Sequence, residues 1–164
     1  MAIVAAIAIS LGVTACGDGG DDDDGAAAGA GCDPAREEAL DPTSATGHVL
    51  PGAPEPDYLT DPPTSGKHQS ATPPRGRLDQ PLPKPAQVSL LEHGEVLLQH
   101  RDLSSEQRRA LEALAADDVT VAPNPDLPAP VVATAWTFKQ TCERVDLASL
   151  REFIREHSGH GAPH

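Results

Sequence analysis

The chain has 164 residues, of which 25 are acidic and 12 basic, and its formal net charge at pH 7 is -13. So acidic a chain repels phosphate backbones, which excludes nucleic acid as its main partner. The 17 prolines and 14 glycines stand against only two Phe, one Trp and one Tyr. This composition predicts one modest domain with long loops and a small hydrophobic core.

The chain begins with an apolar segment. Residues 2–15 are apolar except for Ser10, Gly12 and Thr14. A membrane-spanning helix needs about 20 apolar residues, so this length suits the apolar region of a secretory signal better. The basic residues that usually precede such a region are missing, which leaves two interpretations: the true start lies upstream, or the signal is atypical. We expect residues 1–15 to be a signal that directs export.

The apolar segment ends in Val13-Thr14-Ala15-Cys16, which resembles the lipobox of bacterial lipoproteins. The resemblance implies that Cys16 receives diacylglycerol and becomes the mature N-terminus, anchored to the outer face of the cell membrane. An ordinary cleaved signal and an uncleaved anchor are the alternatives. Residues 16–31 are rich in Gly, Ala and Asp and bury too little apolar surface to fold, so we expect a flexible tether.

Two further cysteines, Cys32 and Cys142, remain if Cys16 carries lipid. An exported protein meets an oxidising compartment, in which two thiols tend to form a disulfide. We predict a disulfide between Cys32 and Cys142, and closing a loop of this size would stabilise the fold by about 4–5 kcal/mol. Two free thiols, or thiolate ligands of a metal, are the alternative.

The remaining residues, 32–164, are expected to form a single domain with two parts. Of the 17 prolines, 11 fall within residues 42–85, and this density excludes regular helices and central strands. We therefore predict an irregular arm over 32–86 that packs on a core over 87–164.

The core has a pattern of alternating strand and helix signals. In chain order, the pattern predicts strands over 87–91 and 95–99, a helix from about 105 to 116, strands over 119–121 and 131–139, and a helix from 147 that ends at Gly159. Ser104 and Gln107 form a capping box before the first helix, and Asp146 caps the second. The order strand-strand-helix-strand-strand-helix predicts an α+β fold, with the helices packed against one small sheet.

Three histidines stand in unusual local sequence. His68 follows Pro62-Pro63-Thr64-Ser65-Gly66-Lys67, His93 lies within Leu91-Glu92-His93-Gly94, and His48 lies between Gly47 and Val49. Proline restricts the backbone and glycine permits sharp turns, so such segments can hold a neighbouring side chain in one orientation. These histidines are therefore the first candidates for chemistry.

From about Cys32 to Pro163 the chain resembles the domain of unknown function 3105 family, a set of mostly bacterial, mostly extracytoplasmic proteins. The resemblance rests on Cys32, Gly47-His48-Val49, Tyr58, Pro62-Pro63-Thr64-Ser65-Gly66 with His68, Gly76, Leu91-Glu92-His93-Gly94, Ala135-Trp136, Cys142 and Phe153-Ile154. It implies a fold unit without an assigned activity. The chain departs from the family at Ser89, where a His is usual, and at Leu78, where a Tyr is frequent.

Our leading hypothesis is that His48, His68 and His93 converge on a transition metal. Imidazole suits Zn²⁺ and Cu²⁺, and three histidines leave a fourth coordination position open. Glu92 or Tyr58 would complete or support the ligand shell. The alternative is that the imidazoles make hydrogen bonds that hold irregular loops in place.

Two other hypotheses compete with the metal site. In the first, Glu92 and His93 act with Ser65 or Thr64 as a hydrolase, although neighbouring residues on a strand point to opposite faces and no Gly-x-Ser-x-Gly elbow is present. In the second, a lipid-anchored body binds another protein of the cell envelope as a scaffold, without chemistry. The weak case for a nucleophile favours a protein that is not an enzyme.

Overall fold

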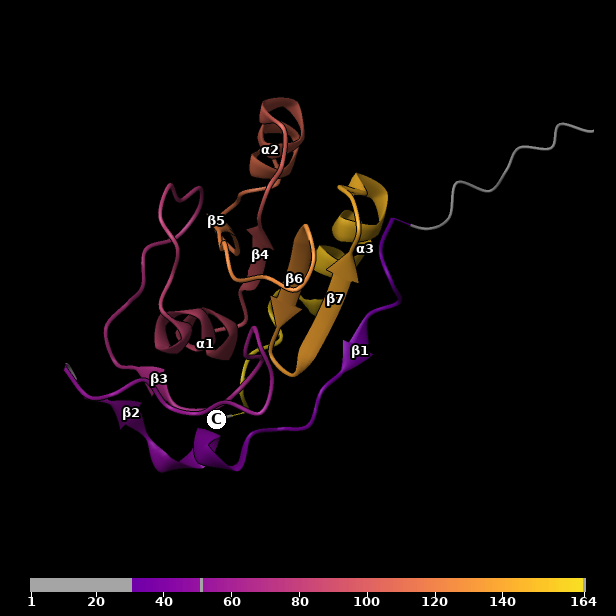
Figure 1. Ribbon diagram of the computed structural model, residues 1–164. Helices are drawn as coiled ribbons and strands as arrows, with labels where there is room; N and C mark the ends of the chain where they lie inside the picture. The colour runs from indigo at the N-terminus through magenta and orange to yellow at the C-terminus, as the bar shows by residue number, and fades with distance from the viewer. Residues whose placement is uncertain (1–30, 51, 164) are drawn as a thin grey trace, which may run out of the picture.

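The computed structural model describes residues 31–50 and 52–163 (Figure 1). Its helices are η1 (Pro42–Thr46, a 3-10 helix), α1 (Lys84–Glu92), α2 (Ser105–Glu112) and α3 (Leu147–His157). Its strands are β1 (Arg36–Glu37), β2 (His48–Val49), β3 (His68–Gln69), β4 (Val96–His100), β5 (Val119–Pro123), β6 (Val131–Ala135) and β7 (Phe138–Cys142). The predicted α+β class is confirmed. The predicted signal over 1–15, Cys16 and nearly all of the predicted tether lie outside the described residues.

A mixed five-stranded sheet has the strand order β1-β7-β6-β4-β5. Strands β4 and β5 are parallel, because α2 connects them as a crossover, whereas the other neighbours in the sheet are antiparallel. In the arm, β2 and β3 form a separate two-stranded parallel sheet. The main sheet therefore belongs almost entirely to the core, and the arm adds only the short edge strand β1.

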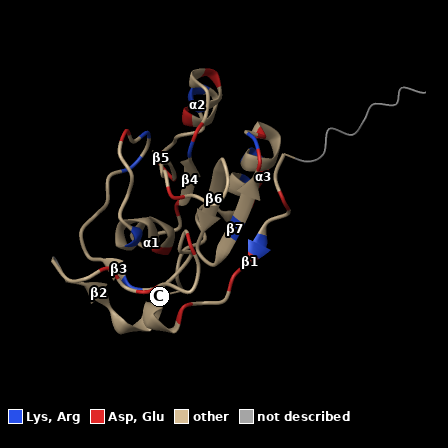
Figure 2. Ribbon diagram, viewed as in Figure 1, with Lys and Arg blue, Asp and Glu red and all other residues tan. Residues whose placement is uncertain are grey.

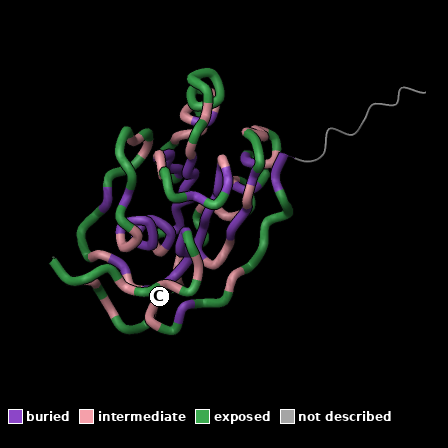
Figure 3. The backbone as a smooth tube through the Cα atoms, viewed as in Figure 1, coloured by how far each residue is buried: buried purple, intermediate pink, exposed green. Residues whose placement is uncertain are grey.

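Helices cover both faces of the main sheet. Successive side chains of a strand point to opposite faces, so Val96 and Leu98 pack with α2 and α3, whereas Leu97 packs with α1. The cluster on the α2 and α3 face includes Leu111, Leu150 and Phe153, all nearly inaccessible to water. Figure 3 shows that burial concentrates in α1 and the central strands, while the arm is mostly exposed.

The arm runs along the β7 edge and then beneath the core to α1 (Figure 1). A disulfide joins Cys32 to Cys142 at its start, as predicted. Beside it, the backbone N–H of Asp33 donates to the carbonyl of Thr141 at 2.8 Å. Because disulfides persist in oxidising compartments, this bond indicates an extracytoplasmic protein. Among the described helices, none is long and apolar enough to cross a membrane.

The prediction of a strand over 87–91 is wrong, because these residues lie within α1. All six residues from Ala86 to Leu91 are buried, so the segment lacks the alternation of polar and apolar residues that separates the two structures. Pro85 lies in the first helical turn, where its missing N–H costs no hydrogen bond. A short apolar run after prolines is thus a buried helix here.

The prediction of one strand over 131–139 is also wrong, because the segment is the hairpin of β6 and β7. The turn at Trp136 and Thr137 escaped prediction since Thr137 adopts φ 59°, a left-handed conformation more typical of glycine. Its backbone N–H donates to the carbonyl of Thr64 in the arm, at 3.0 Å. A contact distant in sequence therefore supports the turn. Strand β6 lies at the centre of the five-stranded sheet.

The N-terminal boundaries of α2 and α3 follow capping signals that can be identified in the sequence. Ser104 and Gln107 form the predicted capping box, and the Asp146 side chain accepts from the N–H of Ser149. This hydrogen bond is the main cause that lowers the pKa of Asp146. Helix α2 stops at Glu112 rather than near 116, because the chain must turn before entering β5.

We predict that replacing both Cys32 and Cys142 with Ala lowers the free energy of unfolding by about 4–5 kcal/mol, since the crosslink spans 110 residues. Urea unfolding of the oxidised wild type and the double variant measures the difference. Wild-type protein reduced with dithiothreitol is the control and should match the double variant. Equal stability of oxidised and reduced wild type would contradict the prediction.

Candidate functional site

The Pro62–Gly66 motif forms a buried platform in the arm. Gly66 has φ +125°, and a Cβ there would lie 2.9 Å from the Tyr58 ring, so only glycine fits. The Tyr58 hydroxyl donates to the carbonyl of Lys67 at 2.8 Å. Burial, followed by the nearby carboxylates of Glu55 and Asp41, raises the pKa of Tyr58. The phenol is therefore a neutral donor that holds the platform.

Other residues of the platform tie it to η1 and to the β6–β7 turn. Ser65 Oγ accepts from the backbone N–H of Asp41 at 2.9 Å. Asp41 is 3% exposed and caps η1, since its Oδ1 accepts from the N–H and the hydroxyl of Thr43. The carbonyl of Thr64 accepts from Thr137. The polar groups of this motif are thus engaged in joining three segments.

The Leu91–Gly94 motif ends α1 and receives the residues that follow α3. Glu92 is the last residue of α1, and Gly94 reverses the chain with φ +84°. The backbone N–H of Gly159 donates to the Gly94 carbonyl at 2.8 Å, and that of Ala162 donates to the Glu92 carbonyl at 2.9 Å. A Cβ on Gly161 would collide with the same Glu92 carbonyl. Close backbone contact therefore fixes residues 159–162 against the motif.

A contact between His68 and Glu92 joins the two motifs. His68 Nε2 lies 2.8 Å from Glu92 Oε2, and the two side chains are only 6% and 19% exposed. The His48 ring stands edge-on to the His68 ring, with 4.8 Å between ring centroids. The pairing of β2 with β3 sets these histidines opposite each other. Segments 20 or more residues apart in the chain thus meet at one point.

His93 does not join this group through any contact of its ring. Its side chain is exposed, and its Nδ1 lies 2.6 Å from the carbonyl oxygen of Ser89. Among residues 31–50 and 52–163, no three His, Cys, Asp or Glu side chains are arranged to hold a metal ion. The predicted set of His48, His68 and His93 therefore gains no support from the geometry, and metal binding stays a prediction.

The groups of the hydrolase hypothesis also have other partners. Ser65 and Thr64 are buried, and Ser65 Oγ accepts from the Asp41 backbone, while His93 Nδ1 donates to the Ser89 carbonyl. A nucleophile needs its base within hydrogen-bond reach. These contacts therefore favour structural roles for the serine and the histidine.

A groove of about 420 Å³ opens beside the His68–Glu92 contact. Glu92 from α1 lines it together with Trp136 from the hairpin turn. Ser44 and Ala45 of η1 and its N-cap residue Asp41 also line it. Residues 162 and 163 close one side. Sequence reasoning missed this site, because its walls come from four separate segments. The only available signal was Trp136, the single tryptophan of a chain poor in aromatics.

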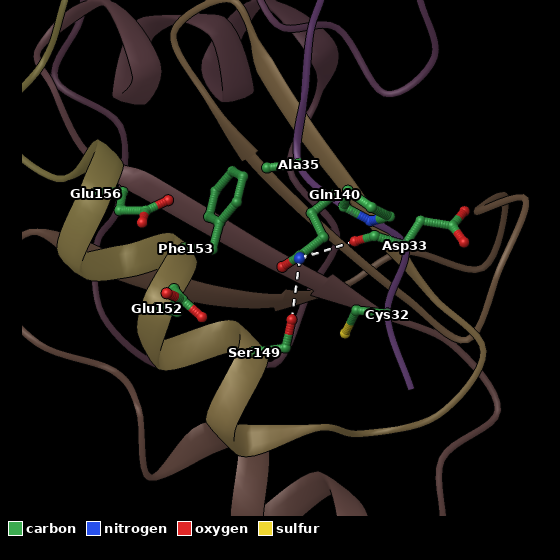
Figure 4. Close-up of a pocket in the computed structure, with 9 residues that line it drawn as sticks. Cys32, Asp33, Ala35, Gln140, Ser149, Glu152, Phe153 and Glu156 are labelled. Atoms are coloured by element: carbon green, nitrogen blue, oxygen red, sulfur yellow. Dashed lines mark hydrogen bonds between the residues drawn. The ribbon is translucent and has the colours of Figure 1, made fainter. Parts of the chain in front are cut away.

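A second cavity, of about 310 Å³, lies between the start of the arm and α3 (Figure 4). Gln140 spans it, since its Nε2 donates to the Asp33 carbonyl at 2.9 Å and to Ser149 Oγ at 3.0 Å. Its amide nitrogen therefore serves to hold the arm against α3. We assign this cavity a structural role.

A family model described as "Protein of unknown function (DUF3105)" matches residues 53–164. The match includes both motifs, the hairpin and α3. The search of curated proteins and the search of solved structures each returned no match.

We predict that His68 and Glu92 stabilise the fold cooperatively. Because both are largely buried, removing one leaves the other without its partner, and Glu92→Ala should cost about 1–3 kcal/mol. In urea unfolding, a double-mutant cycle with His68→Ala should give a coupling energy of about 1 kcal/mol or more. The exposed pair of Arg155 and Glu152 is the matched control, with an expected coupling below about 0.5 kcal/mol. Additive effects at His68 and Glu92 would refute the prediction.

Proposed function

This chain belongs to the DUF3105 family, and from that premise we propose that it is a lipid-anchored, non-catalytic binding domain on the outer face of the cell membrane. The observation that carries the proposal is the groove formed where the two motifs meet, at the His68–Glu92 contact. Concave sites with mostly apolar walls and a few polar groups are typical of small-molecule binding.

Anchoring accounts for the order of segments at the start of the chain. Cys16 would carry the lipid, and residues 16–31 would link it to the body. A flexible Gly-rich chain of this length has a root-mean-square span of about 20 Å. The domain would then stay within about that distance of the bilayer. The disulfide at Cys32, directly after the tether, is consistent with export.

Binding rather than catalysis follows from what the polar groups of the motifs contact. Ser65, His93 and Tyr58 are each engaged with backbone groups. The groove, by contrast, is lined by both Trp136 and Glu92. Such a surface can recognise a ligand without a nucleophile.

The anchor predicts that Cys16→Ser moves the protein from the membrane fraction to the soluble extracytoplasmic fraction. Loss of the acylated thiol removes the only lipid attachment that we propose. Mass spectrometry of the N-terminal peptide should show a diacylglyceryl group on the wild-type protein and none on the variant. An unmodified Cys16 in the membrane-bound wild type would overturn the anchor.

The groove predicts that Ala45→Phe abolishes ligand binding, because a larger side chain on the wall fills the space. The exported Cys16→Ser chain supplies soluble, oxidised protein for a screen of small neutral and charged fragments by NMR. Ala35→Phe, in the cavity of Figure 4, is the matched control. We expect hits that shift groove residues in Ala35→Phe and not in Ala45→Phe. Fragments that bind the Ala45→Phe variant as well as they bind the control would refute this site.

Zn²⁺ or Cu²⁺ binding is the second candidate function, favoured by the contacts of His68 with His48 on one side and Glu92 on the other. The three side chains would have to rearrange to hold an ion, since no such group is in place among the described residues. Two imidazoles and one carboxylate are a common ligand set for such ions. The His68–Glu92 contact would have to open to admit the ion. A rise in melting temperature with Zn²⁺ that His48→Ala removes would support this candidate, and no shift with either metal would end it.

A further inference from the structure

We propose that the groove binds a small alkylamine in its protonated form, with the ammonium group beside Glu92 and Trp136. This inference rests on the proposed binding function and names the class of its ligand. It is carried by the charge of the groove, by its aromatic wall and by an unpartnered hydroxyl group.

The charge of the groove is negative. Two acidic residues, Asp41 and Glu92, line it, and none of the described residues that line it is Lys or Arg. Asp41 is 3% exposed and its Oδ1 accepts two hydrogen bonds from Thr43. The Glu92 side chain is 19% exposed and contacts His68 through Oε2, so Glu92 is the carboxylate better placed to meet a ligand. Lys and Arg lie on α1, α2, α3, β1, β7 and several loops (Figure 2). With a net charge of -13, the whole protein also attracts cations.

The aromatic wall adds a second preference for a cation. Trp136 is 9% exposed and packs with the apolar cluster of α1, which leaves little of the indole to contact a ligand except along the groove. Tryptophan is the best of the aromatic side chains at binding cations over its ring. Leu40 and Ala162 extend the lining with apolar surface, which suits the alkyl part of an amine.

A hydroxyl group distinguishes between kinds of cation. Ser44 lines the groove, and its Oγ atom is buried and has no hydrogen-bond partner among the described residues. Buried polar atoms normally find a partner. An ammonium N–H can donate to this oxygen, whereas a quaternary ammonium cannot. The ligand is therefore a primary or secondary amine rather than a quaternary one.

The single tryptophan of the chain makes the test direct, because tryptophan fluorescence, excited selectively over that of Tyr58, reports on Trp136 alone. The exported Cys16→Ser chain is titrated with pentylammonium, pentanol and pentanoate, which share a chain length and differ in charge. We expect a saturable change with pentylammonium, at least tenfold tighter than with pentanol, and none with pentanoate. The affinity for pentylammonium should fall as NaCl is raised, since salt screens the attraction.

Variants then assign the interaction to its groups. Glu92→Gln should weaken pentylammonium at least tenfold and leave pentanol unchanged, whereas Glu152→Gln on the exposed face of α3 should change neither. Ser44→Ala should weaken pentylammonium severalfold without touching the His68–Glu92 contact, which keeps the test valid if Glu92→Gln disturbs the fold. If pentanol bound as tightly as pentylammonium, the proposed preference for a cation would be refuted, whereas the proposed binding groove would not. If pentylammonium gave no response while neutral fragments bound at the groove, the amine proposal would likewise be refuted and the proposed binding groove would not.

Discussion

The organisation of the site depends on the contact between His68 and Glu92. His68 belongs to an arm rich in proline, and Glu92 ends a core helix. Their side chains are nonetheless largely buried, and His68 Nε2 lies 2.8 Å from Glu92 Oε2. A buried group that loses its partner carries its full desolvation cost. The arm must therefore close on α1 in one register. The Tyr58 and Ser65 hydrogen bonds hold the arm together internally. With the arm in that register, η1 and the hairpin turn line one groove together with Glu92.

Much of the core could be predicted because its signals are local. The capping box at Ser104 and the cap at Asp146 are each read from a few adjacent residues, and both are present. The disulfide followed from cysteine number and compartment. The two errors have non-local causes. Helix α1 is covered by the sheet and by the arm, where Ser89 Oγ donates to the Gln69 carbonyl, so its sequence shows no exposed face. The turn at Thr137 takes an unusual backbone conformation that a carbonyl of the distant arm supports.

The site was predictable only in part, for the same physical reason. The motifs around His68 and Glu92 were recognisable as unusual, and they do meet. Sequence could not say that His93, next to Glu92, would turn instead to the Ser89 carbonyl, because adjacent residues at a helix end point in different directions. Nor could it place Trp136 against η1, since that contact depends on the path of the whole arm. The sequence therefore predicted which residues belong to the site better than it predicted which residues they contact.

The hydrogen bonds that seat Gly159 and Ala162 on the end of α1 have a bearing on how the protein matures. A protein exported as an unfolded chain emerges from its N-terminal side first. Strands β4 and β5 with α2 could pair while later residues are still in transit, but the groove needs Ala162 and Pro163 as one of its sides. The proposed ligand recognition would therefore arise only after residues 162 and 163 have emerged. A molecule halted before that stage would possess most of its sheet and no completed groove.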